Sequence, residues 1–142
     1  MSMFAGQSRE ALRATWRQVW RKWCERVPMQ PLEHQIADVI AEHPEYHALL
    51  QDDPGLAQDD RAEAASGNPF LHMGLHLALR EQLATNRPTG IAEVRTRLAN
   101  RLASAHAAEH RMIEVLAGVL WESQRRGGAP DDRIYLDRLR QL

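Results

Sequence analysis

The sequence has a single cysteine, Cys24, in 142 residues, so no disulfide can form within the chain. Proteins that fold in a reducing compartment typically lack disulfides, and we expect a cytoplasmic location. Met1 is not followed by the uninterrupted apolar stretch of a secretory signal. The longest apolar runs span only a few residues, against the roughly 20 that cross a bilayer, so we expect no membrane-spanning segment.

An excess of charge of either sign is also missing. Lys and Arg together number 18 and Asp and Glu 19, which leaves a net charge of −1. This balance gives no overall attraction to nucleic acid or to an anionic membrane, and we expect neither as a partner. Four arginines recur every four residues near the N-terminus, and we interpret them as the solvated face of a helix: Arg9, Arg13, Arg17 and Arg21.

Several catalytic and binding signatures are absent as well. The scattered glycines form no phosphate-binding fingerprint, and no serine lies in a nucleophile-elbow motif. The His-Glu-x-x-His string of metalloproteases does not occur. The sequence therefore offers no support for nucleotide binding or for nucleophilic catalysis.

The composition is that of an ordinary folded domain. Hydrophobic residues make up 44% and charged residues 26% of the chain, and the length corresponds to about one domain of roughly 150 residues. Apolar residues recur every three or four positions, and no alternating strand pattern is present. We predict one all-α, bundle-like domain over residues 1–142, with about four main helices, a short C-terminal helix and an acidic loop at about 51–67.

Start and stop signals bound the predicted helices. Ser8 is a suitable N-cap for the first helix, Pro31 suits the first turn of the second, and Asn68-Pro69 is the strongest start signal in the chain. Thr89 is available to cap the helix after the turn at 86–90. The expected helices span 8–27, 31–42, 69–85, 91–124 and 131–139.

Two helix boundaries stay open in the sequence. At His43-Pro44 the second helix either kinks or ends, in which case His43 caps a new short helix. The apolar pattern from Ile91 to Leu120 is unbroken, so this segment is either one rod of roughly 50 Å or two helices bent near Asn100.

The histidines are the feature that points to chemistry. Six of the seven form three pairs with the same four-residue spacing, which places two imidazoles one turn apart on one face of a helix. Such a pair can bind a metal ion from one side. The pairs are His43 with His47, His72 with His76, and His106 with His110.

Helical projection places these pairs on inward faces. His72 and His76 point with the leucines of their helix, and His106 and His110 share an apolar face with Glu109. Polar side chains on apolar faces cost several kcal/mol in total unless each finds a partner, and a metal ion provides many partners at once. In the second helix Glu33 lies at the margin of the apolar stripe.

We therefore predict a metal site between helices, holding one or two transition-metal ions. Nitrogen and oxygen ligands without cysteine suit zinc, iron, manganese or nickel. Two ions could activate dioxygen and one could polarise water for hydrolysis, and the sequence assigns neither a reaction nor a substrate. The predicted ligands are His72, His76, His106 and His110, with Glu109 and Glu33 as carboxylates and His43 or His47 completing the set.

A second hypothesis, in which the protein is not a catalyst, competes with this prediction. An isolated histidine pair at this spacing is common on protein surfaces and in cores. On this hypothesis the chain is a helical interaction protein that forms a homodimer, and its histidines form buried hydrogen bonds. Trp20, at the edge of the apolar stripe of the first helix, could mark a dimer contact.

Several strings of the sequence resemble one family over about residues 4–139. They are HPEYH at 43–47, NPFLHMGLHLALREQ at 68–82, RPTGI at 87–91 and the segment 109–125. In these strings the chain resembles the proteobacterial domain of unknown function 1841. The resemblance implies a soluble, helical bacterial protein and carries no activity with it, so the ligand assignments rest on spacing alone.

Overall fold

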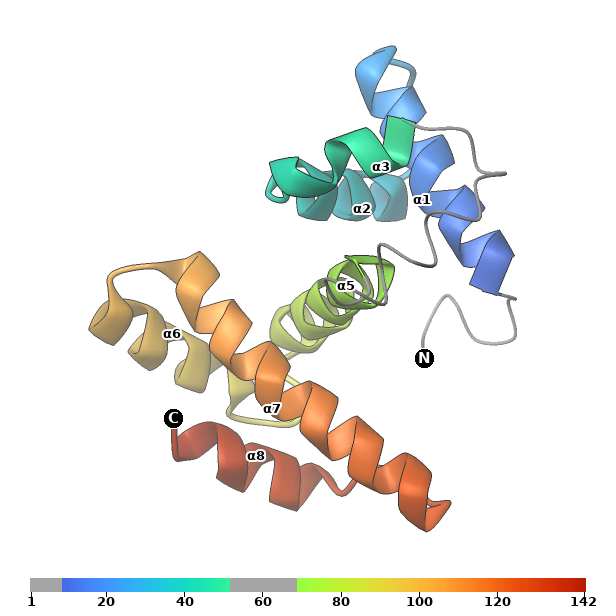
Figure 1. Ribbon diagram of the computed structural model, residues 1–142. Helices are drawn as coiled ribbons and strands as arrows, with labels where there is room; N and C mark the ends of the chain where they lie inside the picture. Colours follow the sequence, from blue (N-terminus) through green and yellow to red (C-terminus); the bar gives the residue numbers. More distant parts are fainter. Residues whose placement is uncertain (1–8, 52–68) are drawn as a thin grey trace. The chain divides into compact units, whose positions relative to one another are not determined.

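The computed structural model describes residues 9–51 and 69–142, and all regular structure in these ranges is helical (Figure 1). The all-α, bundle-like prediction is confirmed. The chain divides into two compact units, Met1–Gly74 and Leu75–Leu142. The predicted acidic loop at about 51–67 lies outside the described residues except for its first position, and the single-domain assignment stays a prediction.

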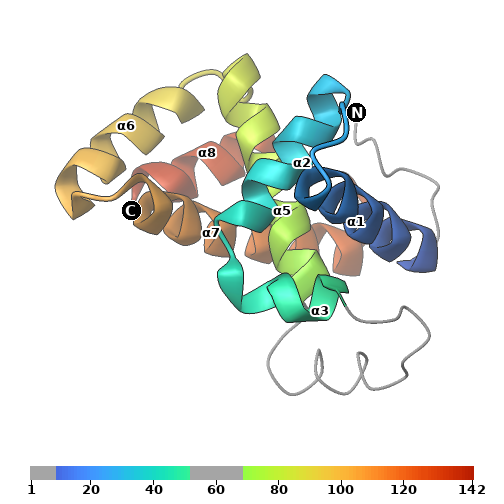
Figure 2. The ribbon, with the colours of Figure 1, turned by 90° about the horizontal axis from the view of Figure 1, so that it is seen from above.

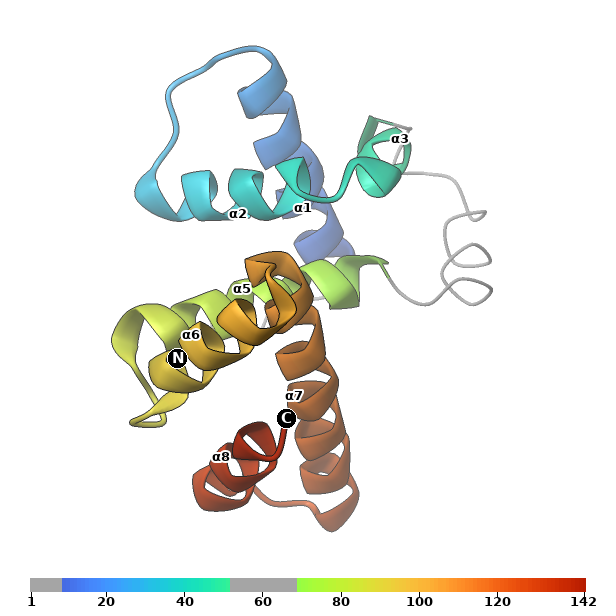
Figure 3. The same ribbon diagram turned by 90° about the vertical axis from the view of Figure 1, so that its left-hand side faces the viewer.

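The first unit is built on two amphipathic helices, α1 (Arg9–Cys24) and α2 (Pro31–Ala41), which pack against each other (Figure 3). Their buried residues follow the apolar spacing of the sequence, because positions three and four apart share one helix face. These residues are Trp16, Val19 and Trp20 of α1 and Ile36, Val39 and Ile40 of α2. The expected cap Ser8 lies outside the described residues.

Helix α2 ends at Ala41, and a new short helix follows it. The turn η1 (Pro44–Tyr46) leads into α3 (His47–Gln51), which corresponds to the second of the two sequence alternatives. His43 stands at the N-cap position of η1 but makes no side-chain capping bond. Its Nδ1 instead lies 2.7 Å from the Val39 carbonyl, so its predicted capping role is wrong.

The arginine face of α1 is not fully solvated. Arg17 is only 7% exposed, and the guanidinium groups of Arg13 and Arg17 lie 5.3 and 5.5 Å from the centre of the Phe70 ring. Cation–π attraction and the apolar stems of the two arginines compensate for this burial. The interpretation of this stripe as a solvated face is therefore wrong for Arg17.

Helix α5 (Pro69–Thr85) contains the division between the units, and its residues from Leu75 onward belong to the second unit. The second unit contains three more helices: α6 (Ile91–Leu102), α7 (Ala105–Arg126) and α8 (Asp132–Arg140). Helix α7 contacts both α6 and α8 (Figure 2). Their shared core is apolar. It contains Leu79, Ile91, Val94, Leu98, Ala108, Met112, Ile113, Leu116, Val119, Tyr135 and Leu139.

The long apolar segment of the sequence forms two helices. The break lies at Ala103, whose φ of 55° is left-handed, and the next helix begins after Ser104. The Ser104 hydroxyl accepts a hydrogen bond from the Ala107 amide at 3.0 Å, which satisfies a free donor of the first turn. Of the two alternatives, the pair of helices is confirmed, and the break lies three residues after Asn100.

The turn before α6 is capped by a different residue from the one expected. Asn86 adopts a φ of 50°, and its Oδ1 accepts hydrogen bonds from the amides of Gly90 and Ala92 at 3.2 and 3.1 Å. An asparagine tolerates this left-handed conformation and reaches nearby amides. The prediction of a Thr89 cap is wrong, because Gly90 occupies the N-cap position and Asn86 satisfies the amides.

Helix ends in the rest of the second unit follow the sequence signals. Helix α7 ends at Gly127, whose φ of 77° suits glycine, and Asp131 caps α8 through the amides of Arg133 and Ile134. Within the described ranges, none of the helices combines the length and the apolar character that a membrane span requires.

The core position of Leu139 gives a test of this packing. Leu139→Ala should lower the free energy of unfolding by about 2–5 kcal/mol, because the side chain is fully buried and leaves a cavity. Ile134→Ala on the same helix is the matched control and should cost clearly less, because Ile134 is already 38% exposed. Urea denaturation measures both, and equal losses would contradict the assigned core.

Candidate metal centre

Three imidazoles lie together in the second unit. His76 projects from α5, and His106 and His110 project from α7. The ring centres of His106 and His110 are 4.1 Å apart, and that of His76 lies 4.9 Å from His110 and 5.6 Å from His106. His76 is fully buried, as expected for a histidine on the leucine face of its helix. Three of the four imidazoles that the sequence predicts to converge therefore lie together within this unit.

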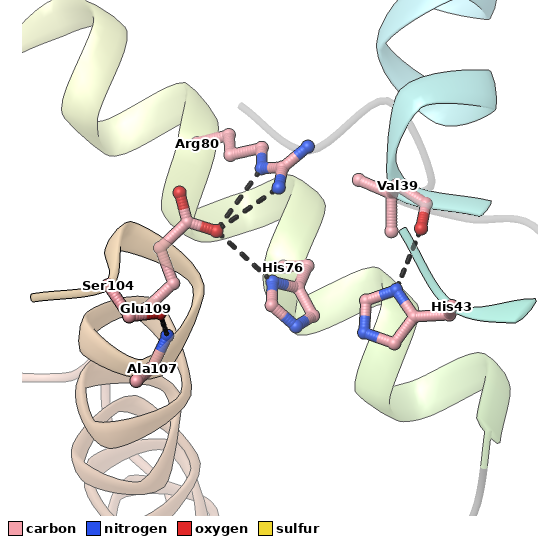
Figure 4. A network of polar contacts seen from close by, with 7 residues as sticks. All are labelled: Val39, His43, His76, Arg80, Ser104, Ala107 and Glu109. Carbon is pink, nitrogen blue, oxygen red and sulfur yellow. Dashed lines mark hydrogen bonds and ion pairs between the residues drawn. The ribbon is translucent and has the colours of Figure 1, made fainter. Parts of the chain in front are cut away.

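A buried carboxylate adjoins His76. Glu109 on α7 is 6% exposed, and its Oε2 lies 3.4 Å from the His76 Nδ1 (Figure 4). The same oxygen accepts hydrogen bonds from Nε and Nη2 of Arg80 at 3.3 and 3.2 Å. Arg80 follows His76 by four residues, so both side chains reach Glu109 from one face of α5.

These contacts keep the Glu109 carboxylate ionised. Burial by itself raises its pKa, but the hydrogen bond from His76 and the positive charge and hydrogen bonds of Arg80 outweigh that effect. The pKa of Glu109 is consequently lowered from its ordinary value. A carboxylate that remains charged in an apolar unit needs such partners, and here both lie on one neighbouring helix.

A second pair of imidazoles lies in the first unit. The ring centres of His43 and His72 are 5.1 Å apart and nearly perpendicular, and Tyr46 stacks on His43 with ring centres 5.6 Å apart. His43 is 1% exposed. Its Nδ1 must carry the hydrogen of the contact with the Val39 carbonyl, since a carbonyl oxygen only accepts (Figure 4).

Within each unit, the ring nitrogens of two histidines come within ligand reach of each other. One ring nitrogen of His43 and one of His72 lie within 4.8 Å of each other, and the same limit holds for His76 and His110. Two nitrogen ligands at about 2.0–2.1 Å from a shared ion are separated by no more than about 4.2 Å, so small side-chain adjustments reach that geometry. In each of these two pairs the histidines lie close enough together to be compatible with metal binding.

The structure does not bring two of the predicted ligands to these groups. His47 packs against Trp20 with the rings tilted and their centres 4.2 Å apart, and its Nε2 donates to the Ile40 carbonyl at 2.9 Å. Glu33 forms an ion pair with Lys22 at 2.7 Å. It stands in the first turn of α2, about 12 Å along the helix axis from the last residue, Ala41.

The partners of Glu33 explain its position at the margin of the apolar stripe. The hydrogen bond from Lys22, followed by one from the Gln30 amide, lowers the pKa of this carboxyl. The second of these bonds belongs to a capping box at the start of α2. The exposed location expected for His34 is confirmed.

Two neighbours of the imidazoles were missed by sequence reasoning, Arg80 and Tyr46. The four-residue step from His76 to Arg80 is a visible signal, because it places a cation on the same helix face. Tyr46 carried no such signal, since its contact with His43 depends on the turn η1. Burial and the nearby charge of Glu45 raise the pKa of Tyr46.

Comparison with known proteins identifies the family of the chain. Residues 8–141 match the family model described as Domain of unknown function (DUF1841). No curated protein and no solved structure matches the chain.

The cap at the start of α7 supports the segment that carries His106, Glu109 and His110. Ser104→Ala should lower the free energy of unfolding by about 1 kcal/mol, because it removes the acceptor for the Ala107 amide. Thr96→Ala is the matched control: this exposed hydroxyl bonds only the Ala92 carbonyl inside α6, and its loss should be nearly neutral. Urea denaturation that finds no difference between these variants would contradict the assigned cap.

Proposed function

We propose that this chain, which belongs to the Domain of unknown function (DUF1841) family, binds one or two transition-metal ions through its histidines. The observation that carries the proposal is the meeting of His76 with His110 and His106 in the second unit. His76 is fully buried, and its ring nitrogens can face an ion only if the ion enters the protein. The proposed ligands there are His76 and His110, with His106 beside them.

The pair in the first unit extends the proposal. His43 and His72 offer two more imidazole nitrogens within 4.8 Å of each other, and we propose both as ligands. Glu33 and His47 are not included, because the Glu33 carboxylate and the His47 Nε2 already bind Lys22 and the Ile40 carbonyl. We leave the number of ions at one or two, as the spacing of the pairs predicts.

The donor set favours particular metals. Imidazole nitrogens suit zinc, iron, nickel and manganese, whereas calcium and magnesium prefer oxygen ligands. The single cysteine, Cys24, is exposed on α1, so the proposal involves no thiolate and is compatible with a cytoplasmic location.

The chemistry that such a site could support follows from its ligands. Neutral imidazoles leave the positive charge of an ion uncompensated, and a bound ion would supply Lewis acidity for hydrolysis or, as a pair, a centre for dioxygen. The residues of this chain hold the nitrogens in place and, through Glu109, supply one negative charge nearby. We propose metal binding as the function and assign no substrate.

Metal content of natively purified protein tests the proposal. Protein prepared without a nickel column should contain near-stoichiometric zinc, iron, manganese or nickel by elemental analysis. The double variant His76→Ala/His110→Ala should lose the ion held in the second unit, because it removes two converging ligands at once. A wild-type protein that is free of all four metals would end this proposal.

Two histidines outside the proposed set serve as matched controls. His34→Ala changes an exposed side chain of α2, and His47→Ala changes a side chain that packs on Trp20. Both variants should retain the metal content of the wild type. Loss of metal in either control, at unchanged folding, would show that the ligand set is assigned incorrectly.

The second candidate function is that of a helical interaction protein that forms a homodimer. In its favour, Trp23 and Val27 are 45% and 41% exposed and border a hollow of about 600 Å³ in the first unit. Exposed aromatic residues are enriched at protein interfaces. On this reading the buried histidines serve only packing and hydrogen bonding.

A chelator distinguishes the two functions. Stripping the ion should lower the Tm of the wild-type protein, since an ion at 100 times its dissociation constant stabilises the folded state by about 2.7 kcal/mol. The double variant His76→Ala/His110→Ala should show a smaller change on chelator addition, because it lacks the ion of the second unit. A wild-type Tm that is insensitive to the chelator would favour the interaction protein, and differential scanning calorimetry measures both.

A further inference from the structure

We propose that Glu109, held by Arg80, is a positioning residue that orients His76 for metal binding and is not itself a ligand. This inference rests on the proposed metal-binding function. It differs from the expectation of the sequence, in which Glu109 is a candidate carboxylate ligand. The geometry around a single oxygen atom, Oε2, separates the two roles.

The contacts that the structure gives Glu109 fall on that oxygen. The His76 Nδ1 lies 3.4 Å from Oε2, and two nitrogens of Arg80 donate to it at 3.2 and 3.3 Å (Figure 4). An oxygen that accepts from a guanidinium and faces an imidazole has its lone pairs directed at nitrogen donors. To coordinate an ion through Oε2, Glu109 would have to give up these contacts in a buried position.

The position of Glu109 also favours one of the two neutral forms of His76, because its Oε2 lies 3.4 Å from Nδ1. A carboxylate only accepts, so this position favours the form with hydrogen on Nδ1 and the lone pair on Nε2. Histidines that bind metals through one nitrogen commonly donate the other to a carboxylate or a backbone carbonyl, which orients the ring and raises its basicity. Glu109 is placed to act on His76 in this way, as the carboxylate that orients the ring.

The first unit contains the same arrangement with a different acceptor. The Nδ1 of His43 donates to the Val39 carbonyl at 2.7 Å, which likewise leaves the lone pair on Nε2. His47 shows the opposite orientation, because its Nε2 donates to the Ile40 carbonyl. The proposed ligands His43 and His76 thus share one orientation, and the excluded histidine has the other.

Arg80 holds the Glu109 carboxylate in place beside His76. Its side chain is about one quarter exposed, whereas Glu109 is nearly buried, so the guanidinium joins the buried charge to the surface of the unit. Without Arg80 the carboxylate would lose two hydrogen bonds and could rotate away from His76. Arg80 therefore acts on His76 through Glu109.

The first test is the state of the His76 ring in the metal-free protein. Long-range proton–nitrogen NMR on labelled protein should find hydrogen on Nδ1 in the wild type and a mixture of the two forms, or the Nε2–H form, in Glu109→Gln. Glu114→Gln, an exposed carboxylate on the same helix, is the matched control and should leave the ring unchanged. An unchanged His76 ring in Glu109→Gln would overturn the inference.

The second test is metal affinity measured by zinc titration. Glu109→Gln should weaken binding about 10- to 100-fold with the same number of ions at saturation, as is typical when an orienting partner of a ligand is lost. Arg80→Met should weaken binding in the same direction, and Glu114→Gln should leave affinity unchanged. Wild-type affinity in Glu109→Gln would contradict the positioning role.

Cobalt substitution separates positioning from direct ligation. The visible spectrum of the Co²⁺-loaded protein should be nearly the same in the wild type and in Glu109→Gln if the carboxylate is outside the coordination shell. A changed spectrum, or loss of one bound ion, would show that Glu109 is a ligand. If Glu109→Gln does not fold, the same measurements on Arg80→Met decide the inference.

The outcomes distinguish this inference from the function on which it rests. If the wild-type protein binds no zinc or cobalt, the proposed function fails, whereas the NMR result still shows whether Glu109 sets the His76 ring. If the wild-type protein binds metal and Glu109→Gln binds equally well, the function stands and the positioning role is overturned. A purely structural role would change the thermal stability of Glu109→Gln without changing the ring form or the affinity.

Discussion

The pairing of the buried Glu109 carboxylate with Arg80 and His76 is the interaction on which the second unit depends. This carboxylate is buried beside an apolar core shared by the helices of the unit, and an unpaired charge there would cost several kcal/mol. Arg80 and His76 compensate for it from one face of α5, which couples the register of α5 to that of α7. The same coupling brings His76 beside His106 and His110, so packing and site share one cause.

Much of the fold could be predicted because the helices follow simple signals. The apolar spacing of α1 and α2 gave their buried faces, and Gly127 and Asp131 marked the end of α7 and the start of α8. The break at Ala103 was less accessible. Neither glycine nor proline marks it, and the apolar period continues through it, so only the left-handed residue and the Ser104 cap define it.

Parts of the site were predictable for the same reason, and others were not. The four-residue spacing on the inward faces of α5 and α7 identified His76, His106, Glu109 and His110 as neighbours. It could not show that Oε2 of Glu109 is already bound by Arg80, because that depends on the side chain of another helix. Helical projection also wrongly suggested Glu33 as a metal ligand, because a carboxylate near an apolar stripe can instead belong to a capping box.

The central claim concerns an ion held by imidazoles, and anomalous X-ray diffraction at the absorption edge of the native metal tests it most directly. The account predicts an anomalous peak at about 2.0–2.1 Å from Nε2 of His76 and from a ring nitrogen of His110, with Oε2 of Glu109 still facing Arg80. Crystals of natively purified protein that show no anomalous peak at these nitrogens would contradict it.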